Sequence, residues 1–318
     1  MKKKDLKSIA GLTLLEMLIG VVISSIMMGA IYTTYTVVNN TYSQVTERAK
    51  ISRSGRDIVE MMMRDIRMAG FKYILGTNTR GWPTRSYLKF DGGNTTIAKS
   101  HDPIIIEKGE SALGPMDSSE SRIAIQGHPD EGSKCCDRIH IVYDDFNQND
   151  ENQPYKRYKI TYYAVPMQRV SDKEYGPNEE DPTEYYGLYR SKSSWIQKLD
   201  AGEGEGKWVY DSESDDCADC YRAELVREYL EDMEFIALDQ NGVMVEAQPS
   251  NMEKIMSIRS VDLKLTFRSS SQKGYFKNKI NRVVKSFTDE RTKQIDSKFH
   301  RDTIFLTVHT RNIGGGDI

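Results

Sequence analysis

The chain has 318 residues, of which 38% are hydrophobic and 29% are charged, and its formal net charge at pH 7 is −3. This length and composition allow a packed domain of substantial size. The slightly acidic balance argues against nucleic-acid binding as the main role of the protein.

A short basic leader precedes a long apolar segment at the start of the chain. The leader carries four lysines in its first seven residues against a single acidic residue, and residues 12–32 contain Glu16 as their only charged side chain. Twenty-one helical residues extend about 31 Å, which is roughly the thickness of a bilayer's hydrocarbon core. The lysines predict that this end stays in the cytoplasm and that the rest of the chain is exported. No small-residue cleavage site follows the apolar run, which indicates that the segment is retained.

Glu16 needs a partner, because a carboxylate within an apolar span costs about 2.5–3.5 kcal/mol on insertion scales. The leader ends in Gly11, and cleavage of the Gly11–Leu12 bond would create an α-amino group at Leu12 and make Glu16 the fifth residue of the mature chain. This arrangement resembles the signal of type IV pilins and pseudopilins. The resemblance implies cleavage by a prepilin peptidase, methylation of the new amine, and pairing of Glu16 with that amine in a neighbouring subunit. The alternative is a charge that is tolerated near the end of the helix.

The helical pattern continues beyond the apolar span. Residues 38–70 repeat a stripe at alternating spacings of three and four, with polar breaks at Ser52 and Arg56, and no proline occurs before Pro83. We therefore expect one helix over residues 12–70, with a membrane half and an amphipathic half that packs on the domain. In the pilin family such helices form the filament core; an ordinary surface helix is an equal alternative for the second half.

The segment that closes this helix carries a second resemblance. Residues 65–71, with the sequence D-I-R-M-A-G-F, are similar to the corresponding segment of PilW-type minor pilins and J-type pseudopilins. Arg64 and Arg67 lie in the last turns, where positive charge suits the helix dipole. Gly70 is predicted to be a left-handed cap.

The remaining residues, 71–318, show the pattern of a β-rich domain. Alternating apolar and polar residues predict strands at 122–126, 138–143, 158–165, 231–239, 261–268 and 303–311. The charged segment 269–301 is expected to be a long loop or a hairpin arm. The last two strands, which end in Arg311-Asn312, also resemble the end of PilW-type proteins. The expected fold class is α+β: a long N-terminal pilin helix followed by a β-rich globular domain.

Four cysteines form two clusters, Cys135-Cys136 and Cys217-Ala-Asp-Cys220. Export favours disulfides. Because a bridge between adjacent cysteines is strained, we expect two bridges that join the 135 loop to the 217 loop, with local pairing in each cluster as the alternative. A zinc site is a weaker alternative, since adjacent cysteines do not easily bind one tetrahedral ion.

One segment suggests a weak metal site. Asp145, Asn147, Asn149 and Glu151 alternate as oxygen donors, as at the beginning of a Ca²⁺ loop, but Lys156 stands where the twelfth-position glutamate is needed. We favour a solvated acidic loop and expect no cofactor. No G-x-S-x-G elbow or comparable catalytic motif occurs, so we expect no enzymatic activity.

The resemblance implies a structural minor pilin of the PilW type that primes and caps a type IV pilus. Its partners would be other minor pilins, the major pilin, the prepilin peptidase and an inner-membrane assembly platform. Before assembly it would span the inner membrane once, with a periplasmic C-terminal domain, and afterwards it would lie at the filament tip. The alternatives are a J-type pseudopilin of a type II secretion pseudopilus, and an adhesin or other binding module mounted on a pilin helix.

Overall fold

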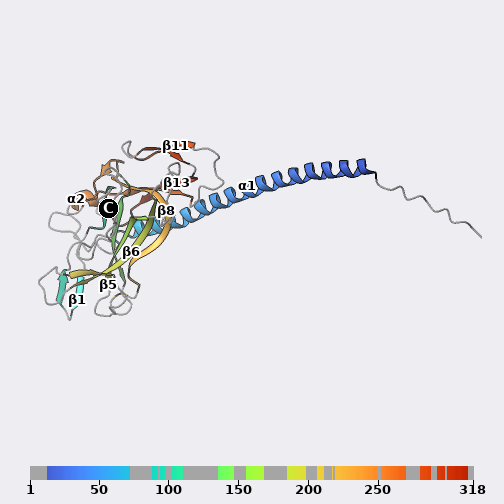
Figure 1. Cartoon of the computed structure of the whole chain (residues 1–318). Helices are drawn as coiled ribbons and strands as arrows, with labels where there is room; N and C mark the ends of the chain where they lie inside the picture. Colours follow the sequence, from blue (N-terminus) through green and yellow to red (C-terminus); the bar gives the residue numbers. More distant parts are fainter. Residues whose placement is uncertain are drawn as a thin grey trace, which may run out of the picture.

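The computed structural model describes residues 13–71, 88–91, 94–97, 102–109, 135–146, 155–167, 185–197, 206–210, 217, 219–248, 252–269, 280–287, 292–297 and 299–313. A long helix projects from one side of a β-rich domain (Figure 1). This arrangement confirms the expected α+β fold class.

The long helix, α1, runs from Leu14 to Met68 without interruption. Its first residue follows Thr13, whose side chain accepts a hydrogen bond from the Glu16 backbone, and such capping satisfies amide groups that have no partner within the helix. Beyond its last turn, Gly70 has a φ of +73°, as expected for a left-handed cap. The structure thus confirms one continuous helix and the cap at Gly70.

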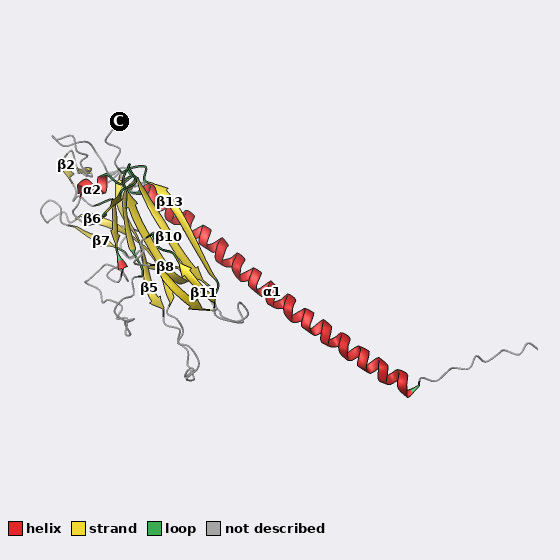
Figure 2. Cartoon of the chain, turned by 90° about the horizontal axis from the view of Figure 1, so that it is seen from above, coloured by secondary structure: helices red, strands yellow, loops and turns green. Residues whose placement is uncertain are grey.

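The domain is built on one large antiparallel sheet (Figure 2). Among the described residues, its strands follow the order β13-β10-β8-β6-β5-β4-β3, while β7 pairs with β6 and β9 pairs with β8. The bounds are β3 Ile104–Glu107, β4 Arg138–Phe146, β5 Tyr155–Met167, β6 Tyr185–Gln197, β7 Gly206–Val209, β8 Tyr221–Leu238, β9 Met244–Val245, β10 Ser260–Arg268 and β13 Arg301–His309. Two separate hairpins are formed by β1 (Leu88–Asp91) with β2 (Asn94–Ile97) and by β11 (Ile280–Val284) with β12 (Lys293–Ser297), and a short helix α2 spans Met252–Met256.

Most of the predicted strands are confirmed. The predictions at 138–143, 158–165, 261–268 and 303–311 coincide with β4, β5, β10 and β13, and the hairpin of β11 and β12 confirms a hairpin arm between the last two. The prediction at 231–239 covers only the second half of β8, and the prediction at 122–126 lies outside the described residues. No prediction anticipated β6, in which short polar runs replace a clean alternation.

One face of the sheet forms the core together with the end of α1. Alternate residues of the central strands point to this face, because successive side chains of a strand point to opposite sides. The opposite face carries buried polar pairs, among them Asp144 with Arg157 and Lys264 with Asp232. The sheet is therefore apolar where it holds the helix and polar on its other side.

Candidate functional site: the two halves of the N-terminal helix

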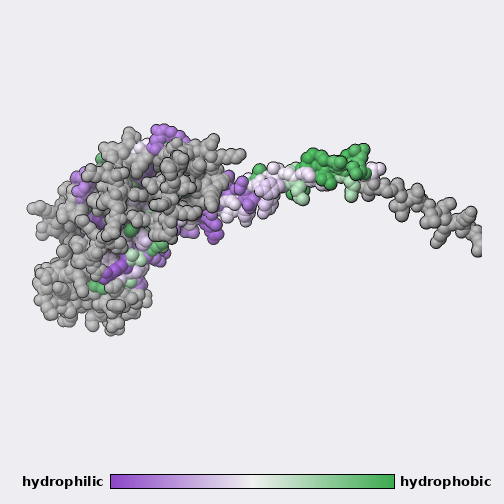
Figure 3. Space-filling view, in the orientation of Figure 1, coloured by the Kyte–Doolittle hydropathy of each residue, from purple (hydrophilic) through white to green (hydrophobic). Residues whose placement is uncertain are grey.

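The first half of α1 is an apolar surface with no cover from the domain. Its large hydrophobic side chains are exposed from Leu14 (81%) to Val45 (62%), and Figure 3 shows this end of the helix as a green, hydrophobic segment away from the domain. Within the described part of the chain, α1 is the one helix long and apolar enough to cross a membrane. A surface of this kind needs a bilayer or other subunits to cover it.

Glu16 interacts with the backbone at the start of the helix. The Thr13 N–H donates to Glu16 Oε2 at 3.2 Å, and the Glu16 N–H donates to Thr13 Oγ1 at 3.2 Å. This capping box satisfies two backbone donors, but it supplies no positive charge to balance the carboxylate. Gly11 and Leu12 lie outside the described residues, so the cleavage and the pairing of Glu16 with a new amine stay predictions.

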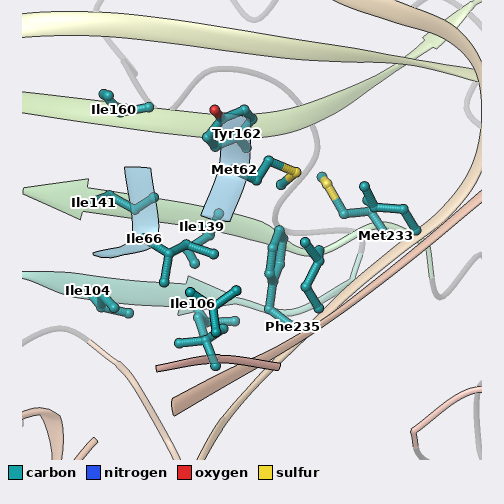
Figure 4. Packing of buried hydrophobic residues seen from close by; sticks show 14 of the residues in the cluster. Met62, Ile66, Ile104, Ile106, Ile139, Ile141, Ile160, Tyr162, Met233 and Phe235 are labelled. Atoms are coloured by element: carbon teal, nitrogen blue, oxygen red, sulfur yellow. The ribbon is translucent and has the colours of Figure 1, made fainter. Parts of the chain in front are cut away.

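The second half of α1 is fixed to the domain by apolar packing. Met62 and Ile66 are fully buried between the helix and the sheet, next to residues of β3, β4, β5 and β8 such as Ile139 and Phe235 (Figure 4). Gly55 allows a close approach to β13, because an added Cβ would lie 2.5 Å from Ile304 Cδ1. This half is amphipathic, as predicted, but its buried face runs through Ile51, Gly55 and Met62 and not through the predicted Ser52 and Arg56.

A buried ionic group reinforces this packing. Asp65, 4% exposed, accepts bonds from Arg190 Nη2 of β6 at 2.9 Å and from the Tyr162 hydroxyl of β5 at 2.6 Å. Burial and the negative charge of Asp65 raise the pKa of Tyr162, so its hydroxyl stays protonated and donates to Asp65. Asp65 therefore connects α1 to two central strands.

The end of the helix is held by the segment that follows β13 and by β4. Asn312 Nδ2 donates to the Arg67 carbonyl at 2.9 Å, and the Gly70 N–H donates to the Val142 carbonyl at 2.9 Å. The helix-closing segment and the terminal Arg311-Asn312, which carry two of the resemblances seen in the sequence, thus meet in space.

Asp65 was not predicted from the sequence. A signal was available, because an acidic residue near a helix C-terminus opposes the helix dipole and therefore needs another reason to be there. The prediction emphasised Arg64 and Arg67 instead, but Arg64 is exposed and it is Asp65 that is buried.

The disulfide pairing differs from the favoured expectation. The structure joins Cys135 to Cys136 and Cys217 to Cys220, which is the local alternative, and not the two loops to each other. The reason is that the two clusters lie beside different parts of β8. The first cluster is next to Met233, whose carbonyl accepts a hydrogen bond from the Asp137 N–H, whereas the second directly precedes Tyr221, where β8 begins. Twelve residues of regular strand would span roughly 40 Å. The irregularities of β8, where the nine positions from Tyr221 to Leu230 match six positions of β6, shorten this to roughly 30 Å, whereas a disulfide requires Cα atoms within about 7 Å.

The weak calcium site receives no support from the part of the chain that the structure describes. Asp145 is exposed near the end of β4, opposite Lys156 of β5, and Asn147, Asn149 and Glu151 lie outside the described residues. The site stays a prediction.

Comparison with known protein families identifies a motif at the start of the chain. Residues 6–32 match the prokaryotic N-terminal methylation motif. The chain has no significant match among curated proteins or solved structures. The protein is type IV pilin-like. The motif implies processing by a prepilin peptidase and assembly with other pilins, and the single apolar helix is consistent with membrane anchoring.

Proposed function

We propose that the protein is a structural minor pilin of the PilW type, and not an enzyme, which co-assembles with other minor pilins to prime and cap a type IV pilus. The observation that carries this proposal is the division of α1. One half is apolar and uncovered, and the other is fixed to a large domain by buried contacts. A helix of this kind can enter a bundle of similar helices while its domain remains outside the bundle.

The contacts between the helix and the domain support the resemblance to PilW-type proteins. The residues that carry it, Asp65 to Phe71 and Asn312, bind each other or the central sheet and so set the direction in which α1 leaves the domain. A subunit at a filament tip needs a fixed angle of this kind, because its helix must enter the bundle while its domain closes the end. Before assembly the domain would lie in the periplasm, where disulfides such as Cys217–Cys220 persist.

The proposal is tested by the mature N-terminus and by the position in the filament. Protein purified from filaments should begin at Leu12 with a methylated amine, and gold-labelled antibodies should mark filament ends. Chains that begin at Met1, or labels along the whole filament length, would contradict it. Deletion of the gene should remove filaments and leave protein secretion intact; loss of secretion with normal filaments would favour the J-type pseudopilin.

A further inference from the structure

A buried lysine on the sheet face opposite α1 lies between two carboxylates. Lys264 of β10 is fully buried, and its Nζ lies 2.7 Å from Asp232 Oδ2 and 3.6 Å from Glu234 Oε2, both on the neighbouring strand β8. The strand register places Lys264 opposite Glu234 and Thr266 opposite Asp232. One amine thus faces two acidic side chains across a single strand pair.

Glu234 is held in place by the segment that follows β11. The Ser286 hydroxyl and the Phe287 N–H donate to Glu234 Oε2, the latter at 3.2 Å. The side chain of Glu234 is 1% exposed, and that of Asp232 is 11% exposed. One ammonium and two carboxylates thus lie together in a site that is largely closed to water, where charges are costly to bury. An amide bond between Lys264 and Asp232 would remove two of these three buried charges.

We propose that Lys264 and Asp232 form an intramolecular amide cross-link, with Glu234 as the proton carrier. The Lys264 Nζ, after transfer of a proton to Glu234, attacks Cγ of Asp232. The new bond joins Nζ to Cγ, and the bond from Cγ to one Asp232 oxygen breaks. Of the three protons on the ammonium, one stays on the amide nitrogen and two leave with that oxygen as water, and Glu234 returns to its initial state. The step needs no oxidant, reductant or other reactant.

The geometry fits this chemistry. Nζ is in hydrogen-bond contact with a carboxylate oxygen of Asp232, so its distance to Cγ exceeds the 2.7 Å contact by at most one C–O bond. Fixed positions of this kind convert an attack that is slow in solution into an effectively unimolecular one. A buried carboxyl within reach of the transferred proton supplies acid–base catalysis. The small exposed part of Asp232 gives the released water a way out.

The cross-link would connect the two strands nearest the C-terminal edge strand β13. The lysine and the aspartate are separated by 32 positions in the sequence, so the bond would close a loop that contains β9 and α2. Strands β8 and β10 could then not separate when the domain is heated or stretched.

Intact-mass spectrometry of the full chain, purified in detergent and reduced, tests the proposal without any variant. The expected mass is lower than the sequence mass of the processed chain by one water molecule. After trypsin digestion, the peptide 228–254 should be joined to the peptide 260–268, because the acylated lysine is no longer cut. A chain of full mass with a linear peptide 260–264 would overturn the proposal and leave an ordinary ion pair.

Substitutions at the three positions test the role of each side chain in the reaction. Lys264→Met and Asp232→Ala should show the full mass, and Glu234→Gln should show mainly full mass because it lacks the proton acceptor. Asp232→Asn should form the same amide with loss of ammonia, and its absence there would count against the attack at Cγ. Lys108 provides an internal control: it lies 2.9 Å from Asp137 Oδ2, but its side chain is 55% exposed, so its peptide should remain linear.

Discussion

The two halves of α1 share one continuous backbone but differ in what covers them. From Leu14 to Val45 the large apolar side chains are exposed on all sides of the helix, whereas from Ile51 to Ile66 the buried residues lie on one face against the sheet. A helix that is hydrophobic all round needs a bilayer or other helices, while a one-sided helix needs only a domain. The comparison shows that a single helix can have its packing partners within the chain in one half and lack them in the other. The uncovered half is where assembly with other subunits is expected.

Each half also carries one acidic side chain in a costly position: Asp65 is buried in the domain, and Glu16 lies in the apolar half. Asp65 has its partners within the chain, Arg190 and Tyr162, while Glu16 has only the backbone and hydroxyl of Thr13 among the described residues. A carboxylate with a partner in the same chain should contribute to folding. A carboxylate without a cationic partner in its own chain should contribute to association.

The largest expected effect is on assembly, from Glu16→Ala. If the carboxylate pairs with a buried amine in the filament, its loss leaves that amine unpaired and costs about 3–5 kcal/mol, roughly a factor of 10² to 10³ or more in an association constant. Filaments should be lost while the amount of this protein in the membrane stays normal. Filament counts and membrane blots of the same strain measure both.

Thr13→Ala is the matched control for Glu16, because it removes the hydroxyl that caps the Glu16 N–H and keeps the charge. It should retain most filaments if the charge is what matters. Equal loss in both variants would mean that Glu16 acts through the helix cap alone, and normal filaments in Glu16→Ala would mean that the charge is merely tolerated.

The second effect is on stability, from Asp65→Ala. The change leaves Arg190 beside an apolar gap and removes the acceptor of the Tyr162 hydroxyl. Breaking such a buried pair typically costs about 3–5 kcal/mol of unfolding free energy. Thermal unfolding of the purified chain in detergent should show a markedly lower Tm. Asp57→Ala, an exposed position on the same helix, is the control and should leave the Tm unchanged.

A smaller effect is expected from Gly70→Ala. The φ of +73° is unfavourable for a residue with a Cβ by about 1–2 kcal/mol, and the added Cβ would lie 3.1 Å from the Asn312 carbonyl oxygen. Denaturant unfolding should report this loss. Gly20→Ala in the exposed half meets no atom within 4 Å of the new Cβ and should leave the domain's stability unaltered. Equal losses at both positions would contradict the division of the helix.

Acid should loosen the domain and leave the exposed half of α1 unaffected. Burial lowers the pKa of His140 below its ordinary 6.5, against the opposing effect of Glu107, so the folded state holds the imidazole neutral. Below pH 6.5 the unfolded chain binds the proton more readily, and stability should therefore decrease as the pH falls from 7 towards 5. His140→Gln should flatten this slope in Tm measurements. An unchanged slope would assign the acid sensitivity to other groups.

Glu107 adds a second window at lower pH. Burial raises its pKa, but the nearby imidazole of His140 and the charge of Arg138 outweigh burial and lower the pKa from 4.5 to about 2. The unfolded chain therefore binds this proton first as well, and its contribution is lost as the pH falls from 4.5 towards 2.

The sequence by itself determined the features that depend on local pattern. The length of the apolar run, the absence of proline before Pro83 and the glycine at position 70 were enough to predict a long helix with a left-handed cap. Period-two alternation was enough for β4, β5, β10 and β13. These features follow from backbone geometry and local hydrophobicity, which need no knowledge of distant residues.

Only the tertiary structure decided which distant groups meet. Asp65 looks like any charged residue near a helix end until β5 and β6 bring Tyr162 and Arg190 to it, more than ninety positions later in the chain. The sequence allows the two cysteine clusters to pair with each other, but β8 separates them in the fold. Contacts of this kind depend on the order and register of the strands, and many registers are compatible with the same alternating pattern until the packing of the whole sheet selects one.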